Sequence, residues 1–335
     1  FMNNFNGSYT YSNLNDFLTN AKPNAAAATY SVVPGDATPA AKFSAAQLGF
    51  YFQDEIDAFK GFKLIAGLRV DVPLFFDDPA ANPLIASTFP GQRTDQSPSG
   101  QILVSPRLSF NWDLTGDRAL QLRGGAGLLT SRAPFVWLSN QFTNSGMLYG
   151  AVNATNGTGT FIADPANQKA AGGSATTYEV NLANNNFKLP QVFRTNIAAD
   201  FKLPGGITGT LEALFSKTVN NVLYKNLNLK PSIGTINSSL TGGNDKRPLY
   251  NYPLTAGKVN STFTNVYYLD NTDQGSNYNL TAQLQKSFNF GLFVSGAYTY
   301  GKSKDVNSGA NSTASSNFGF LQIVNDPNNP DLAYS

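Results

Sequence analysis

Apolar and polar residues alternate one by one along several long segments of the chain. In residues 62–72 one row is mainly polar, and the other row is apolar throughout: Phe62, Leu64, Ala66, Leu68, Val70 and Val72. Successive side chains of a β-strand point to opposite faces, so this pattern predicts a strand with one face for hydrocarbon and one for water.

The same alternation recurs in residues 107–114, 120–128, 193–203 and 280–285. The alternating segments run for about 10 to 14 residues, whereas a soluble strand usually has about 5 to 6. A tilted strand needs roughly 9 to 11 residues to cross a bilayer. The lengths therefore predict membrane-spanning strands.

Short and long connections follow one another in strict order. Short links are expected near residues 57–61, 115–117, 204–206 and 289–291. Long links rich in Asn, Gly, Ser, Thr and Pro are expected near residues 75–101, 132–190, 220–275 and 305–317. Bacterial barrels have short periplasmic turns and long outer loops, so the order predicts eight strands in four hairpins. Two further strands are predicted near residues 5–11 and from about residue 318.

Composition supports an all-β, antiparallel transmembrane β-barrel in the outer membrane of a Gram-negative bacterium, with extracellular loops. Only 13% of the residues are charged and 41% are apolar, and no apolar run is long enough for a transmembrane helix. Residues 1–335 are expected to form part of a single barrel domain. About ten strands fit either a small barrel or a fragment of a larger one, and we favour the fragment because the last residues lack a closing aromatic.

Aromatic residues make up 13% of the chain and gather near the predicted strand ends. Interfacial girdles of a barrel would account for them. The alternative is ordinary core packing in a β-sandwich, which the strand lengths disfavour. The candidate interfacial aromatics are Phe50, Tyr51, Phe52, Trp112, Trp137, Tyr298 and Tyr300.

Charged residues lie on the polar rows of the predicted strands and are candidates for the barrel lumen. They can line a transport path or hold a plug, or they can simply be solvated or paired with one another. The candidate lumen-facing residues are Arg69, Asp71, Arg107, Arg123, Arg194 and Asp200. The glycine-rich run 124–127 lies within a strand, so we expect close strand packing or a bend there.

The sequence favours neither catalysis nor a bound cofactor. It contains no His and no Cys, which excludes a Ser-His-Asp triad, a Cys nucleophile and a His-bearing zinc site. Asp77 and Asp78, and the acidic and amide residues of 325–331, offer oxygen ligands but lack the spacing of a calcium loop. No metal site is predicted. The net charge of +2 is too small to indicate nucleic-acid binding.

Several motifs resemble the barrels of TonB-dependent receptors, and in particular the Oar-like subgroup, also described as OmpA-related or carboxypeptidase-regulatory-like. They occur at residues 49–55 (GFYFQDE), 67–71 (GLRVD), 105–113 (SPRLSFNWD), 122–127 (LRGGAG), 137–141 (WLSNQ), 189–194 (LPQVFR) and 298–305 (YTYGKSKD). The resemblance covers most strands from about residue 45 to 320 and is weak in the long loops.

The resemblance implies a 22-stranded barrel that is plugged by an N-terminal domain and energised by the TonB complex. The plug and the TonB-contacting segment are not expected within this chain. The implied partners are outer-membrane lipid, an extracellular ligand and an outer-membrane lipoprotein. The ligand class stays open between a peptide or protein-derived ligand, a siderophore and a glycan.

Three functions remain in competition at this point. The first is import of a ligand through a plugged barrel. The second is a surface-exposed barrel that serves as an anchor in adhesion or envelope assembly. The third is a passive porin-like channel, which needs an open lumen.

Overall fold

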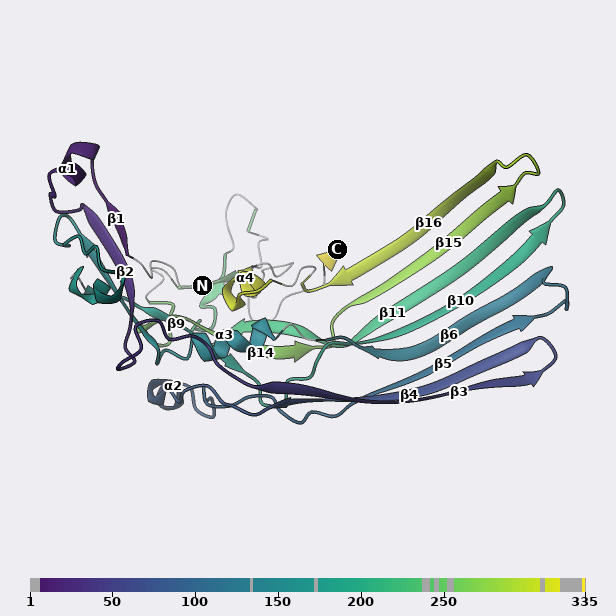
Figure 1. The fold of residues 1–335 in the computed structure, drawn as a ribbon, viewed down its shortest axis with the longest axis horizontal. Coiled ribbons are helices and arrows are strands. Elements are labelled where there is room, and N and C mark those ends of the chain that lie inside the picture. Colours follow the sequence, from purple (N-terminus) through teal and green to yellow (C-terminus); the bar gives the residue numbers. More distant parts are fainter. Residues whose placement is uncertain are drawn as a thin grey trace.

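The structure is a computed structural model that describes residues 7–132, 135–171, 174–236, 242–243, 247–251, 256–307, 311–319 and 333–334. Figure 1 shows two parts, namely a curved sheet of long strands and a region of shorter elements at one end of it. We call the first part the wall and the second part the loop region.

The wall has eight long strands, and each pairs antiparallel with its neighbours in the order β16-β15-β11-β10-β6-β5-β4-β3. Their bounds are β3 Ala45–Phe59, β4 Phe62–Phe75, β5 Leu103–Asp113, β6 Leu120–Thr130, β10 Gln191–Leu203, β11 Ile207–Asn226, β15 Ser276–Ser287 and β16 Phe293–Asp305. The four predicted hairpins are confirmed. Across the described residues the sheet is open, with β3 at one edge and the short strand β17 (Ala333–Tyr334) beside β16 at the other.

The register divides the wall into an apolar face and a polar face. Phe52 lies opposite Leu68, and Leu280 lies between Ala213 and Tyr300, so the apolar rows of neighbouring strands coincide. These side chains are accessible, with Phe52 71% and Tyr298 72% exposed. An accessible apolar face of this width suits contact with lipid.

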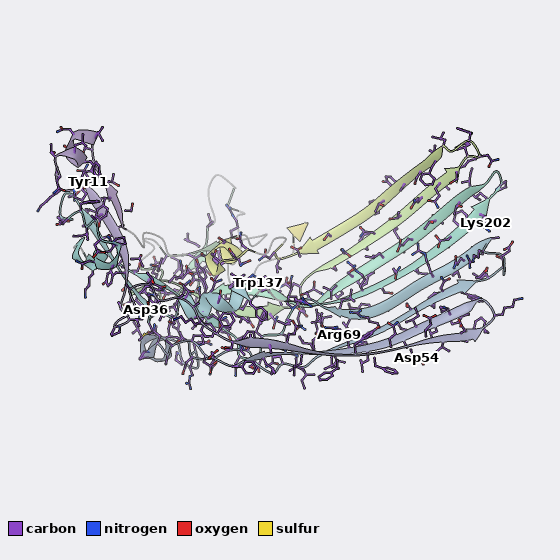
Figure 2. All side chains as sticks on the ribbon, in the orientation of Figure 1. Tyr11, Asp36, Asp54, Arg69, Trp137 and Lys202 are labelled. Carbon is purple, nitrogen blue, oxygen red and sulfur yellow. The ribbon has the colours of Figure 1, made fainter. Side chains whose placement is uncertain are left out.

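Asp54 is a charged exception on the apolar face of the wall. It lies opposite Ala66 and is exposed (Figure 2). We have no physical account of its position.

The glycine run of β6 packs closely against both neighbouring strands, as predicted. A Cβ atom on Gly124 would lie 2.8 Å from the carbonyl oxygen of Asn196 in β10. One on Gly125 would lie 2.9 Å from the carbonyl oxygen of Leu108 in β5. Side chains at these positions would force the strands to shift, which accounts for glycine there.

The loop region is built from the long links and the segment before β3. Its elements are β1 Ser8–Thr10, α1 Leu14–Leu18, β2 Ala25–Ser31, α2 Pro83–Thr88, α3 Val136–Thr143, β7 Tyr149–Thr155, η1 Pro165–Ala171, β8 Ser174–Ala175, β9 Tyr178–Ala183, β12 Gly234–Thr235, β13 Pro248–Leu249, β14 Phe263–Thr272 and α4 Ala314–Gly319. None of the helices in the described residues is long and apolar enough to cross a bilayer.

The strand predicted near residues 5–11 is present but lies outside the wall, and most of the strand predicted from about residue 318 lies outside the described residues. Residues 8–10 do form a strand, but it belongs to a separate sheet in the order β1-β2-β7-β8. Residues 314–319 form helix α4 where a strand was expected from about residue 318, and residues 320–332 lie outside the described residues.

Strand β9 makes a parallel pair with β14, and β14 makes an antiparallel pair with the far end of β11. Strand β9 belongs to the link between β6 and β10, whereas β14 belongs to the link between β11 and β15. Two long links that are far apart in sequence are therefore joined by backbone hydrogen bonds, and β11 extends the wall into the loop region.

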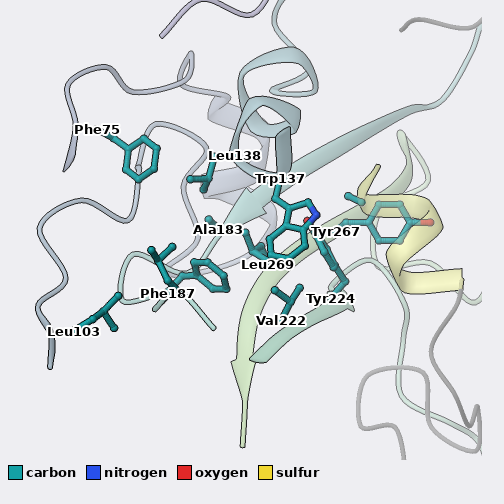
Figure 3. Packing of buried hydrophobic residues seen from close by; sticks show 12 residues of the cluster. Phe75, Leu103, Trp137, Leu138, Ala183, Phe187, Val222, Tyr224, Tyr267 and Leu269 are labelled. Carbon is teal, nitrogen blue, oxygen red and sulfur yellow. The ribbon is translucent and has the colours of Figure 1, made fainter. Parts of the chain in front are cut away.

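The main buried core lies in the loop region and where it meets the wall. One cluster includes Trp137 and Leu138 of α3 together with Tyr224, Tyr267 and Leu269 (Figure 3). In α3 the buried residues recur as two adjacent pairs four apart, Trp137 with Leu138 and Gln141 with Phe142, which places them on one side of the helix.

A second buried cluster surrounds Phe263, whose side chain is fully buried. Its ring lies 5.3 Å from Tyr178 and 6.2 Å from Phe89, measured between ring centroids. Helix α2 reaches this cluster through Ile85, and the helix begins where Asn82 accepts a hydrogen bond from the Leu84 amide and Pro83 occupies the first turn.

Candidate functional site

All six predicted lumen residues lie on the polar face of the wall. Gly127 is paired with both Arg107 and Arg194, and Arg123 is level with Ala198, the second residue before Asp200. Neighbouring residues at the same register share a face, so four adjacent strands, β4, β5, β6 and β10, carry these charges on one surface. In a closed barrel the polar face is the lumenal face.

A cavity of about 420 Å³ lies on the polar face close to the loop region. Its charged lining consists of three arginines and one carboxylate, Asp71, which is 2% exposed. Arg69 donates two hydrogen bonds to Asp71, at 2.8 Å from Nε and 2.7 Å from Nη2. The full lining is Gln47, Tyr51, Arg69, Asp71, Arg107, Thr130 and Arg132.

The two remaining arginines of this cavity, Arg107 and Arg132, form no ion pair with any described residue. The carboxylate of Asp71 already has Arg69 and the amide of Gln47, 3.3 Å away, as partners. The cavity therefore carries an excess of positive charge. Arginine presents a planar set of donors that suits carboxylate and phosphate groups.

Further from the loop region, most of the charges are paired across strands. Arg123 Nε donates to Asp200 at 2.8 Å, and Thr210 donates to the other oxygen of the same carboxylate at 2.6 Å. Arg194, which is at the same level as Arg107 in the register, donates from Nε to the hydroxyl of Ser216 at 3.3 Å. Four of the six candidate lumen-facing residues therefore form ion pairs with one another, Arg69 with Asp71 and Arg123 with Asp200.

Five of the seven predicted interfacial aromatics lie on the apolar face, namely Phe50, Phe52, Trp112, Tyr298 and Tyr300. Trp112 is close to the short-turn end of the wall, and its ring centroid lies 5.9 Å from that of Phe59 and 6.0 Å from that of Phe62. Their position at a membrane interface stays a prediction.

The other two aromatics need correction. Tyr51 lies on the polar face, opposite Arg69, and its hydroxyl donates to Gln53. Trp137 is 6% exposed within the core of the loop region, and its indole N–H donates to the carbonyl of Asn311 at 2.9 Å. An aromatic residue can fill a core or mark an interface, and position along the chain alone does not separate the two.

Three lining residues of the cavity, Gln47, Thr130 and Arg132, were not among the predicted site residues. Gln47 is in the same alternating row as Tyr51, Gln53 and Glu55, so strict alternation could have identified it. Arg132 follows the end of β6, beyond the alternating segment. Of the residues considered for calcium, Asp77 accepts a hydrogen bond from the Ser44 amide at 2.6 Å, and residues 325–331 lie outside the described residues.

Three solved structures share limited similarity with the chain. They are the siderophore receptor PirA from Pseudomonas aeruginosa (14% identity, TM-score 0.41, 78% of this chain and 36% of that chain), a mutant of the ferric enterobactin receptor PfeA from the same species (12%, 0.44, 84% and 35%) and the outer membrane transporter YddB from Escherichia coli (9%, 0.44, 84% and 29%). The chain spans about a third of the length of these structures. No curated protein matches it.

The family comparison covers almost the whole sequence. Residues 2–335 match the family described as outer membrane beta barrel domain. The antiparallel wall, with one accessible apolar face and one polar face, is the architecture that such a family requires. The chain therefore belongs to the outer membrane β-barrel domain family, and its place is the outer membrane of a Gram-negative bacterium.

Proposed function

We propose that this chain is part of the barrel of a TonB-dependent receptor of the Oar-like subgroup, which imports a ligand from the medium. The observation that carries the proposal is the polar face of the wall. It begins beside the loop region with an arginine-rich cavity and continues toward the short turns as a series of paired polar side chains. The sequence motifs shared with that subgroup supply the choice of subgroup.

The two parts of the polar face suit two steps of import. Charges that are already paired, such as Arg123 with Asp200, give a hydrated surface that holds a passing ligand weakly. Arg107 and Arg132 are available for an anionic group on the ligand or on a plug. The plug, the TonB complex and an outer-membrane lipoprotein are the proposed partners, and the proposal includes no catalytic step.

Two measurements on the native protein test this proposal. The first is the mass and N-terminal sequence of the protein purified from outer membranes, where we expect a mass well above the 35.9 kDa of this stretch and a plug-sized domain before it. The second is uptake by living cells, identified by comparing medium components taken up by wild-type and deletion strains. Uptake should stop when the proton-motive force is collapsed or when TonB is deleted.

The competing functions predict different results. A passive channel would conduct ions steadily across a planar bilayer and would be indifferent to the loss of TonB. An anchor for adhesion or assembly would show neither conductance nor energy-dependent uptake, and deletion would change cell attachment or envelope composition. Either result would overturn the import proposal.

A further inference from the structure

A cavity of about 530 Å³ lies in the loop region, between the sheet of β2 and β7 and the start of β9. Its volume is within the range of roughly 300 to 1,000 Å³ that is usual for small-ligand sites. Three tyrosines line it, one each from β2, β7 and β9: Tyr30, Tyr149 and Tyr178. The cavity also has several threonine side chains and one carboxylate, Glu179, in its lining.

Glu179 has no positive partner in the described part of the chain. No lysine or arginine there forms an ion pair with it, and its polar side-chain contacts are with neutral amides, of which that of Asn144 lies 3.4 Å from Oε1. The side chain is half-buried, and desolvation raises the pKa of its carboxyl group. A carboxylate removed from water without a counter-charge is costly, which singles it out from the paired acids of this protein.

Two of the tyrosine rings pack directly against the backbone of glycine residues, which have no side chain in the way. Tyr30 is opposite Gly150 in the pair of β2 and β7, and a Cβ atom on Gly150 would lie 2.6 Å from the ring of Tyr30. A Cβ atom on Gly146 would lie 2.6 Å from the ring of Tyr178. The rings thus occupy space that only a residue without a side chain leaves free.

An aromatic ring here already attracts a cation. The ammonium group of Lys169 lies 5.8 Å from the centroid of the Tyr30 ring, a distance at which the ring quadrupole attracts positive charge. Lys169 is exposed and does not reach Glu179. Within the described residues, the charge of Glu179 therefore has no compensating cation.

We propose that this cavity binds a ligand through a positively charged primary amine, which contacts the carboxylate of Glu179 while the body of the ligand packs among Tyr30, Tyr149 and Tyr178. An ammonium group supplies both the missing counter-charge and the partner for aromatic rings. An anionic ligand would be repelled by Glu179, and a neutral one would leave the carboxylate uncompensated. The inference deepens the proposed function by naming the ligand class, and as a statement about import it rests on that function.

Binding to the full-length protein, purified in detergent, tests the inference without any need for transport. The first probe is Nα-acetyl-lysine amide, whose side-chain amine is free and positively charged. The second probe is the same compound with the side-chain amine also acetylated, so that it is neutral but has the same lysine body. We expect the charged probe to bind about tenfold more tightly to the wild-type protein, as calorimetry or ligand-observed NMR can measure. In Glu179→Gln the preference should fall to within about twofold.

Two further variants keep the test specific. Asp78→Asn removes one exposed carboxylate that does not line the cavity, and it should keep the full preference for the charged probe. Gly150→Ala keeps Glu179 but displaces the Tyr30 ring, so both probes should bind more weakly while the preference persists. Protease resistance of each variant confirms that the loop region is folded.

Equal binding of the two probes to the wild-type protein, or an unchanged preference in Glu179→Gln, would overturn the inference. If the preference is found but cells show no energy-dependent uptake, the import proposal fails and the amine site stands. If uptake is found without the preference, the import proposal stands and the amine site fails.

Discussion

The wall and the loop region use the same large apolar side chains in opposite ways. In the wall, Phe52 is 71% exposed on the apolar face, where lipid covers it. In the loop region, Phe263 is fully buried among other side chains. The first type of residue is selected for what surrounds the protein, and the second for how it fits its neighbours.

This contrast changes what a mutation does in each region. When a large apolar residue of the wall is replaced by a smaller one, lipid fills the space and no enclosed cavity is left. When it is replaced by a charged residue, the charge must be placed in the hydrocarbon of the bilayer, which is costly. A loop-region core residue that shortens leaves a void that its neighbours fill only in part. The wall should therefore be sensitive to polarity, and the loop region to volume.

The largest effect is expected for Phe263→Ala. The change should lower the free energy of unfolding of the loop region by about 3–5 kcal/mol, because it removes a buried ring that contacts Tyr178 and Phe89. Hydrogen exchange of β9 and β14 measures the change. Phe52→Ala in the wall is the matched control and should leave that exchange unaltered; equal effects of the two variants would erase the contrast between the regions.

The next effect concerns two adjacent residues on opposite faces of β10. Ile197→Arg places a charge on the apolar face and should destabilise the folded protein in lipid by up to about 2–4 kcal/mol. Asn196→Arg places the same charge on the polar face beside Glu212, which already accepts a hydrogen bond from Asn196 at 3.1 Å. Equilibrium folding into lipid vesicles should show little loss for Asn196→Arg, and a reversed order would mean that the faces are assigned wrongly.

A smaller effect depends on pH. Burial alone raises the pKa of the Asp270 carboxyl, but the ammonium of Lys225 at 2.7 Å and the amide of Asn184 at 2.8 Å outweigh it, so the pKa is lowered. The resulting stability is present above the unfolded pKa of about 3.9 and is lost as the pH falls through the folded pKa. Asp270→Asn should therefore unfold the loop region more easily at pH 7, by about 1–3 kcal/mol.

Glu179, in the same region, should give the opposite dependence of stability on pH. Desolvation raises the pKa of its carboxyl group. The stability linked to its protonation is complete below the unfolded pKa of about 4.3 and is lost as the pH rises through the folded pKa. Thermal denaturation should find Glu179→Gln more stable than wild type at neutral pH and equal to it in acid, whereas Asp270→Asn should be less stable at neutral pH and equal in acid.

The smallest effect is expected for a pair on the polar face of the wall. A double-mutant cycle on Arg123 and Asp200 should give a coupling energy of about 0.5–1 kcal/mol, because both side chains face the solvated side of the sheet and are partly exposed. The coupling should shrink as salt is added. A coupling energy of several kcal/mol that does not change with salt would contradict the prediction, because it would mean that water does not reach this pair.

The wall could be predicted from the sequence because each strand carries its own signal. Alternation is local, so the row of Phe62 to Val72 and the turns between hairpins can be identified without knowing the partner strand. The same rule places Tyr51 on the polar face, since it alternates with Phe50 and Phe52, and the grouping of all three by aromatic type alone was the error.

The loop region could not be predicted in the same way. Trp137 is buried through contacts with residues more than 80 positions away in the chain, such as Tyr224 and Tyr267, and no local period announces such contacts. The pairing of β9 with β14 is likewise set by tertiary packing. Glu179 carried no signal in the sequence because a single Glu in a polar link is usually solvated.

The parallel pair of β9 and β14 also bears on how this surface can diversify. Outer loops that made no backbone hydrogen bonds with one another could be exchanged one at a time. Here a graft of the link between β6 and β10 alone would bring a foreign β9 against the resident β14, and the register from Tyr178 with Phe263 to Ala183 with Leu269 would be lost. The two links should be inherited, and engineered, as one cassette.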